Sequence, residues 1–342
     1  MESLPVKNTA HKGFWPALTL FFLAPAIGEL LSGSAPPAEF FNPFGLLLLG
    51  LLYGGGAILI HELRVRWGKG WRTVFMLGAA YGIIEEGLMC KSFFDPNWMD
   101  LGILGTYGRW AGVNWVWSLE LTIYHAIFSI SIPILLVELL FPAQRDERWL
   151  GRRGMIVMPI LFAADVIFGF LFLTPYRPPV LPFLLACVVI ALLILWAKRL
   201  PSPEPAAGGN SLAKKLPRLR WFTLVGLVAT LAFFFFNWGL PNLNLPVPVT
   251  MLLVIVLAGL VWLVLRHMSR RGAWGDKHHL ALAAGALGFL IILAPLQELD
   301  KTRLDNTSGM ALVGLAFLLL LVWLWRQTGR PSRQINQPTL AT

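Results

Sequence analysis

Ten long apolar segments follow one another along the chain, and they constrain its fold more than any other feature. Each has about 20 residues, the length that an α-helix needs to cross the hydrocarbon core of a bilayer. Of the 342 residues 56% are hydrophobic and 13% are charged, whereas about a quarter of the residues in a soluble domain are charged. We therefore expect an all-α, polytopic integral membrane protein. The predicted spans are residues 14–32, 43–62, 73–92, 115–140, 155–173, 180–197, 221–239, 248–265, 280–296 and 309–325.

Positive charge alternates between successive loops. Most of the 28 Lys and Arg residues lie in one set of loops. The opposite set holds Lys91, Arg109, Arg177, Lys301 and Arg303. By the positive-inside rule, this asymmetry predicts a multi-pass protein of the cell membrane with both termini in the cytoplasm. The net charge of +10 is explained by this orientation, so the bilayer is the expected partner and nucleic acid is not.

The chain divides into parts at a basic connection, residues 198–220, whose Pro, Gly and charged residues are typical of a flexible cytoplasmic linker. We expect a cytoplasmic N-terminus at 1–13, a six-helix unit at 14–197, a four-helix unit at 221–326 and a cytoplasmic tail at 327–342. Only the first six helices carry ionisable residues in their central turns. Function is therefore expected in the six-helix unit, with the last four helices packing against it or against lipid.

The third and fourth spans contain the candidate site, formed by Glu85, Glu86 and His125. A charge near the bilayer centre costs at least about 2.5 to 3.5 kcal/mol, so such residues usually face a protein interior or a water-filled cavity. Helices joined by one loop are usually adjacent and antiparallel. A rise of about 1.5 Å per residue then places the Glu pair roughly 10 to 12 Å deep and His125 about 15 Å deep. We expect His125 to contact Glu85 or Glu86.

Helical periodicity supports this pairing. Gly78 and Gly82 share one face with Glu85 on the third span, and small residues at this spacing let a neighbouring backbone come close. The fourth span carries a polar stripe within a sector of about 80 degrees. Its residues are Asn114, Ser118, Thr122, His125 and Ser129.

Several kinds of chemistry are open to such a cluster. Two adjacent carboxylates in a low dielectric resist ionising together, so one of them is expected to hold a proton near neutral pH. An imidazole beside them can relay protons or, with Glu86, bind a divalent metal. Carboxylate and imidazole can also activate a water for attack on a carbonyl. A hydrolase, a proton-coupled carrier of a small solute, and a structural or partner-binding network that only orders the helices all fit these residues.

Residues 84–94, with the sequence IEEGLMCKSFF, resemble the first motif of the CAAX-protease and bacteriocin-processing (CPBP) intramembrane protease family. In that motif a Glu pair is followed by Arg four residues after the second Glu. Glu85 and Glu86 match the pair, whereas Cys90 stands at the Arg position and Lys91 comes next.

Later motifs of that family supply a Phe that is separated by three residues from a His, and then a further His. His125 corresponds to the first of these histidines, with Leu121 in place of Phe, and no later helix of the first six supplies the second. The resemblance implies that the Glu and His side chains activate a water for peptide cleavage.

Three further residues are secondary candidates for the site: Asp165 near the middle of the fifth span, Glu120 on another face of the fourth, and Lys91. Asp165 could join the site or make a hydrogen bond between helices.

The remaining ionisable residues of these spans lie nearer the helix ends. An interfacial ion pair or helix cap is expected for His61 and Glu62, and Glu29 and Glu138 are expected to reach the interface.

Overall fold

The computed structural model describes residues 13–202, 216–269 and 274–328. Most of the predicted linker, at 203–215, and nearly all of both predicted termini lie outside these residues. The flanks of the linker are helical, since one helix continues to Arg199 and the next begins at Leu219.

All ten predicted spans are helical. The first four combine α-helix with π-helix, as does the seventh, and the other five are regular α-helices. The α-helices up to the end of the fourth span are α1 (Phe14–Pro25), the short α2 (Pro37–Phe40) between the first two spans, α3 (Pro43–Leu49), α4 (Gly55–Arg66), α5 (Trp71–Ile83), α6 (Trp115–Tyr124) and α7 (Ile132–Leu140). The others are α8 (Gly154–Phe172), α9 (Val180–Arg199), α10 (Leu219–Phe234), α11 (Leu240–Asn242), α12 (Val247–Ser269), α13 (Asp276–Leu299) and α14 (Met310–Gln327).

Nine helices of the described part of the chain are long and apolar enough to cross a membrane. The predicted span that is not among these nine is the third, 73–92. It forms a continuous helix, residues 71–89, which carries Arg72, Glu85 and Glu86 and is therefore less apolar than the rest. The protein is an all-α polytopic membrane protein, as the sequence predicts.

In the described part of the chain, five π-helical segments interrupt the spans: Ala26–Leu31, Gly50–Gly54, Ile84–Met89, His125–Ser131 and Phe235–Gly239. A π-helix contains one residue more per hydrogen-bonded turn than an α-helix, so side chains beyond it are rotated relative to the 3.6-residue pattern. Such segments occur frequently at functional sites. Four of the five lie in the first four spans.

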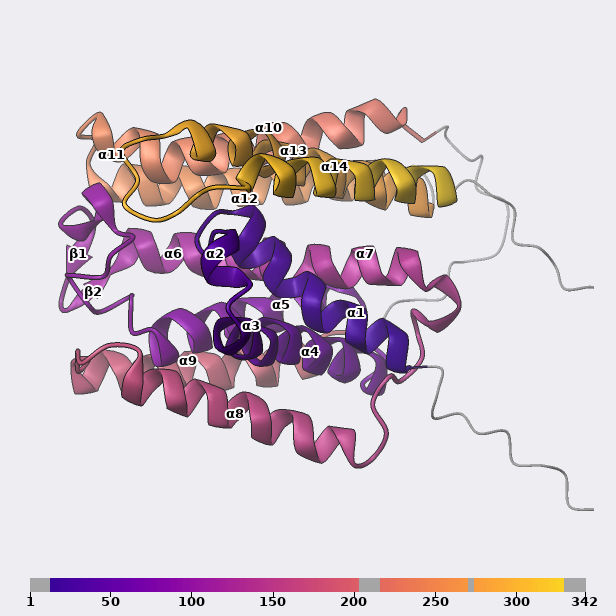
Figure 1. Cartoon of the computed structure of the whole chain (residues 1–342), viewed down its shortest axis with the longest axis horizontal. Coiled ribbons are helices and arrows are strands. Elements are labelled where there is room, and N and C mark those ends of the chain that lie inside the picture. The colour runs from indigo at the N-terminus through magenta and orange to yellow at the C-terminus, as the bar shows by residue number, and fades with distance from the viewer. Residues whose placement is uncertain (1–12, 203–215, 270–273, 329–342) are drawn as a thin grey trace, which may run out of the picture.

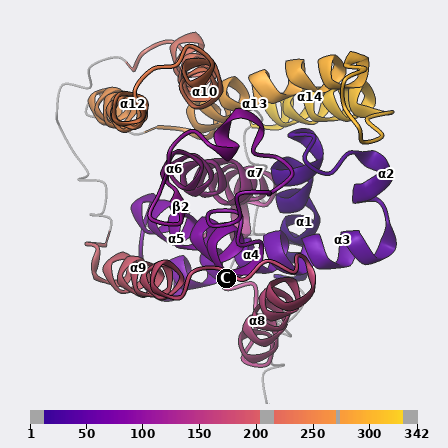
Figure 2. The same cartoon turned by 90° about the vertical axis from the view of Figure 1, so that its left-hand side faces the viewer.

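The helices form two groups that pack on one another (Figure 1). In the first group, α5 packs against the segments of the fourth span and against α9, while α1 and α4 lie beside them (Figure 2). In the second, α13 packs between α10 and α14. One apolar cluster joins the groups, because Ile27 and Phe128 of the first lie in the same core as Leu287 and Phe317 of the second.

Close backbone contact holds the second group together. A Cβ atom on Gly285 of α13 would lie 2.0 Å from the carbonyl oxygen of Thr223 in α10, and one on Gly226 would lie 2.3 Å from that of Leu282. Neither position has room for a side chain, so these glycines set the distance between the two helices.

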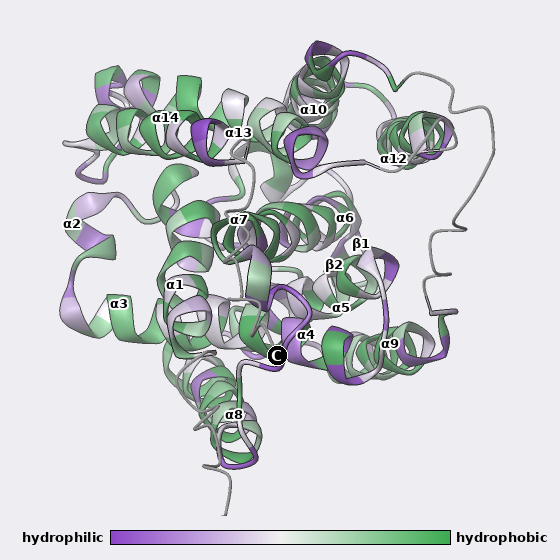
Figure 3. Cartoon of the chain, turned by 90° about the vertical axis from the view of Figure 1, so that its right-hand side faces the viewer, coloured by the Kyte–Doolittle hydropathy of each residue, from purple (hydrophilic) through white to green (hydrophobic). Residues whose placement is uncertain are grey.

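The outer helices present apolar side chains outwards, as lipid-facing helices do. Leu181 and Leu192 on α9 and Leu252 and Leu263 on α12 are more than half exposed. Seen from the basic end, the visible turns of these helices and of α8 are largely green, the colour of hydrophobic residues (Figure 3).

The two ends of the bundle differ. One end, here called the hairpin end, carries strands β1 (Arg109–Trp110) and β2 (Val113–Asn114), which pair antiparallel through the two-residue turn Ala111–Gly112. Both turn residues have positive φ, at 52° and 78°, which is the geometry of tight hairpin turns. The opposite end, called the basic end, is where α1 begins and α14 ends (Figure 1).

Candidate functional site

Two glycines of α5 allow the fourth span to approach. A Cβ atom on Gly78 would lie 2.9 Å from the Cα of Ala126, and one on Gly82 would lie 3.1 Å from the Cβ of His125. Because glycine offers no side chain at either position, the two backbones lie in close contact. The side chains beyond Gly82 on α5 are therefore brought next to His125.

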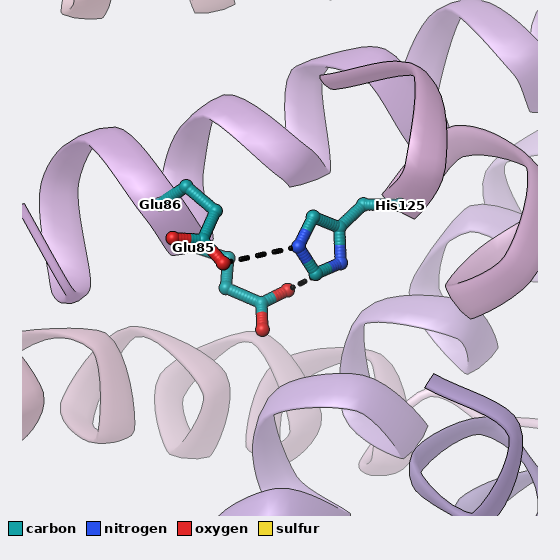
Figure 4. A group of neighbouring side chains, drawn as sticks. All are labelled: Glu85, Glu86 and His125. Carbon is teal, nitrogen blue, oxygen red and sulfur yellow. Dashed lines mark hydrogen bonds and ion pairs between the residues drawn. The ribbon is translucent and has the colours of Figure 1, made fainter. Parts of the chain in front are cut away.

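The structure brings Glu85, Glu86 and His125 together (Figure 4). Nε2 of His125 lies 3.1 Å from Oε1 of Glu86, and Nδ1 lies 3.2 Å from Oε2 of Glu85. The sequence predicts contact with one or the other Glu, whereas the imidazole reaches both. The π-helix at Ile84–Met89 contains both glutamates, and a second π-helix begins at His125.

All three side chains are removed from solvent. Glu85 is 3% exposed, Glu86 9% and His125 2%. Isolated charges at such positions are costly. The imidazole stabilises Glu86 by a hydrogen bond and Glu85 by an ion-pair contact.

Neighbouring polar groups orient the three side chains. Oγ of Ser129 lies 2.9 Å from Nδ1 of His125. Ser92 donates a hydrogen bond to Glu86, and Nε1 of Trp117 donates to Oγ of Ser92 at 3.0 Å. The loop after the third span and the start of the fourth therefore fix the second carboxylate, which limits its rotation.

Aromatic rings and a further acid complete the surroundings. The rings of Tyr53, Tyr81 and Tyr124 lie with centroids 5.4 to 6.0 Å from that of His125. The hydroxyl of Tyr53 donates to Glu29. Glu29, for which an interfacial position is expected, therefore has a hydrogen-bond partner on the second span. An ionisable residue within a membrane span is rare, so the sequence could identify Glu29 as a candidate for the site. Tyr53 is not ionised at neutral pH, so nothing in the sequence identifies it.

The secondary candidates lie apart from this cluster. Glu120 accepts a hydrogen bond of 2.6 Å from Nε1 of Trp238, so it belongs to the contact between α6 and the seventh span. Lys91 donates to the carbonyl oxygens of Phe170 and Thr174, at 2.7 and 3.0 Å, where its charge complements the C-terminal end of α8. Both secondary candidates thus bind neighbouring helices, and within the described structure neither forms a hydrogen bond or ion pair with Glu85, Glu86 or His125.

Asp165 is 3% exposed, and both its carboxylate oxygens lack a hydrogen-bond partner among the described residues. Its neighbours one turn away on α8 contact the third span, since the ring of Phe162 lies 6.2 Å from that of Tyr81 and Gly169 adjoins Met89. Asp165 thus faces the helix that carries Glu85 and Glu86, but no hydrogen bond or ion pair joins it to them within the described structure.

A second polar cluster occupies the basic end. His61 is fully buried, stacks on the ring of Trp149 at 3.5 Å between centroids, and has Nε2 3.2 Å from the carbonyl oxygen of Arg145. Glu138 is 5% exposed and pairs with Arg64 at 2.9 Å. The ion pair expected at the end of the second span is present, since Nε of Arg66 lies 2.9 Å from Oε2 of Glu62. The connection after α7 covers His61 and Glu138 from solvent.

The Glu–Glu–His cluster has the composition of a metal site. One ligand atom from each residue lies within 4.8 Å of the others, so small side-chain movements would bring the three around one ion. Two carboxylates and one imidazole suit divalent zinc, iron or manganese, and three protein ligands leave a position for water.

A family model described as "Uncharacterized membrane protein family" matches residues 18–342. The chain belongs to this family. This match does not confirm the resemblance to the CPBP proteases, which stays limited to the motif residues named above. The chain is similar to an "Uncharacterized protein" of Archaeoglobus fulgidus, with 26% identity over 129 aligned residues. The alignment covers 37% of this chain and 38% of the relative. The match thus spans less than half of that relative. No solved structure matches the chain.

Proposed function

We propose that this protein is an intramembrane hydrolase whose active site is formed by Glu85, Glu86 and His125. The observation that carries the proposal is the placement of one buried imidazole against two buried carboxylates, with a ring nitrogen within 3.2 Å of each. A divalent metal held by Glu86 and His125, with Glu85 as a third ligand, would supply a Lewis acid at this site.

In the proposed reaction a carboxylate of the Glu pair accepts a proton from water as the water oxygen adds to a carbonyl carbon. The proton then passes to the leaving group as the bond between that group and the carbon breaks. His125 lies against both carboxylates and stabilises the negative charge that develops. Burial strengthens this stabilisation, because fixed charges act more strongly in a low dielectric.

An apolar layer favours this reading over a proton-coupled carrier. Along α4, Ala57, Ile58 and Ile60 lie between Tyr53 at the site and His61 at the basic end, and each is at most 5% exposed. Ile134 and Val137 of α7 are likewise fully buried between His125 and Glu138. A carrier needs a polar path to both sides, whereas these residues separate the two polar clusters.

Metal analysis of the purified protein is the first test. We expect about one divalent metal ion per wild-type chain after loading and dialysis, and a loss of at least about tenfold in affinity in Glu86→Gln and His125→Ala because each removes a ligand. Glu120→Gln is the matched control, since it changes a buried carboxylate of the same span pair outside the cluster. Equal metal content in all four proteins would contradict the metal site.

Hydrolysis and transport are separated by a second measurement. Reconstituted protein is incubated with a library of membrane-embedded peptides and the products are identified by mass spectrometry. Cleavage that is lost in Glu86→Gln but kept in Glu120→Gln supports the hydrolase. Proton flux into proteoliposomes that depends on Glu85, with no cleavage product from any peptide, would establish the carrier instead.

We also propose that the protein lies in the cell membrane with its basic end, and both termini, in the cytoplasm. The excess of Lys and Arg in the loops of that end supports this orientation. The candidate site would then lie in the outer half of the membrane.

A further inference from the structure

A groove at the hairpin end lies apart from the Glu–His cluster. It has a volume of about 750 Å³ and runs between the β1–β2 hairpin and the first turns of α12. Its walls include Tyr107, Trp110 and Trp115 on the hairpin side and Pro248 and Met251 on α12. Trp110 is 73% exposed and Trp115 41%, so two large aromatic rings stand open at the groove.

The position of the groove corresponds to the membrane surface. The hairpin leads directly into α6, and the other wall is the beginning of α12, so both walls lie where spans start. Tryptophan and tyrosine favour the level of the lipid headgroups. The hydroxyl of Tyr107 fixes the two walls to one another, because it donates to the carbonyl oxygen of Leu245 at 2.8 Å and lies 2.7 Å from Oγ1 of Thr250.

Arg109 is the single charged residue in the groove wall. It donates to three backbone carbonyl oxygens, those of Gly105, Phe94 and Asp95, at 3.2, 2.7 and 3.1 Å. These bonds hold the guanidinium rigidly and use three of its five N–H groups. Among the described residues no carboxylate lies within ion-pair distance of it.

We propose that this groove binds one anionic phospholipid, with an acyl chain along Trp115 and Met251 and the headgroup phosphate at Arg109. A fixed, unpaired guanidinium with two free donors complements a phosphate that carries a net negative charge. The apolar walls complement the first part of a hydrocarbon chain, which begins just below the headgroups. The phospholipid bridges the hairpin and α12, and thus the six-helix and four-helix parts of the chain.

Native mass spectrometry of the full-length protein tests the proposal. The purified protein is mixed with equal amounts of phosphatidylglycerol and phosphatidylcholine that have identical acyl chains. We expect one phosphatidylglycerol to be retained in preference to phosphatidylcholine, by about fivefold, the contribution of one basic residue near a membrane surface. Arg109→Gln should remove the preference.

Two further variants keep the outcome interpretable. Met251→Trp leaves Arg109 in place but fills the groove, so retention of both lipids should be lost. Arg177→Gln removes another arginine of the same end, whose Nη1 donates to the carbonyl oxygen of its neighbour Tyr176, and should bind lipid as the wild type does. Equal retention of the two lipids by the wild type, or unchanged retention by Met251→Trp, would overturn the proposal. Neither result depends on hydrolysis at Glu86.

Discussion

Buried carboxylates of this protein differ in the groups that surround them, and those groups decide what each can do. Glu62 is fully buried and accepts from three donors: the backbone N–H groups of Trp149 and Leu150 and Nε of Arg66. These three donors satisfy its carboxylate oxygens, and two of them belong to the connection between α7 and α8, which Glu62 thereby holds in place. Glu85 and Glu86 instead face an imidazole that can exchange protons or share a metal, which leaves them open to chemistry.

The anchoring role of Glu62 predicts a stability effect. Glu62→Gln keeps the shape but removes the charge that accepts from three donors, so the free energy of unfolding should fall by about 1.5 to 3 kcal/mol. Thermal unfolding in detergent measures this change. Glu147→Gln is the control, because Glu147 is an exposed residue of the same connection, and a loss as large as that of Glu62→Gln would contradict the assignment.

Two features of the individual helices, π-helical segments and glycines at contact points, position the side chains of the site. The π-helical segments at Ala26–Leu31, Gly50–Gly54, Ile84–Met89 and His125–Ser131 hold Glu29, Tyr53, the Glu pair and His125, respectively. An extra residue in the turn rotates the side chains beyond it. A functional side chain can therefore point in a different direction from the side chains that pack against the neighbouring helix. Glycines at the contact points then allow the helices to approach closely enough for these side chains to meet.

The glycine contacts predict a difference between two positions of α13. Gly285→Ala should lower the free energy of unfolding by about 2 kcal/mol, because the added Cβ would lie 2.0 Å from the Thr223 carbonyl oxygen and the helices would have to separate. Gly288→Ala places its Cβ in ordinary contact, 3.8 Å from Leu227, and should leave stability nearly unchanged. Thermal unfolding of the two variants compares them directly. Equal losses would show that close packing of α10 on α13 is not the cause.

At the scale of the whole molecule, two buried polar clusters lie at different depths with an apolar layer between them. Polar contacts at both ends also connect the two groups of helices. At the basic end, Arg145 forms a bidentate ion pair with Asp276 of α13, with both N–O distances 2.9 Å. Gln297 of α13 donates to the carbonyl oxygen of Ser32 at 2.7 Å. The four-helix part is therefore attached to the part that carries the site.

The proposed orientation predicts the accessibility of the two ends. In a protein whose Cys90 and Cys187 are replaced by alanine, Met99→Cys should react in intact cells with a membrane-impermeant maleimide, because Met99 is 86% exposed at the hairpin end. Arg152→Cys, at an exposed position of the basic end, should react only after permeabilisation. The reverse pattern would invert the topology and place the site in the inner half of the membrane.

The sequence predicts the helices to within a few residues. Segment 115–140 corresponds to the helix Trp115–Leu140, and 14–32 to the helix 14–31. Span length and apolar composition are local properties, so no knowledge of packing is needed to find them. The rarity of charge in a membrane likewise points to Glu85, Glu86 and His125 before any contact is known.

Contacts between spans were decided by the tertiary structure. A constant 100 degrees per residue no longer holds within a π-helix, and distances between helices depend on which small residues meet, so sequence spacing leaves open which Glu faces His125. Packing between helices likewise determines that Tyr53 lies beside the site and that Lys91 binds the C-terminal end of α8. Bilayer thickness and side-chain polarity thus define the spans and their ionisable residues, whereas non-local packing determines which of those residues come together.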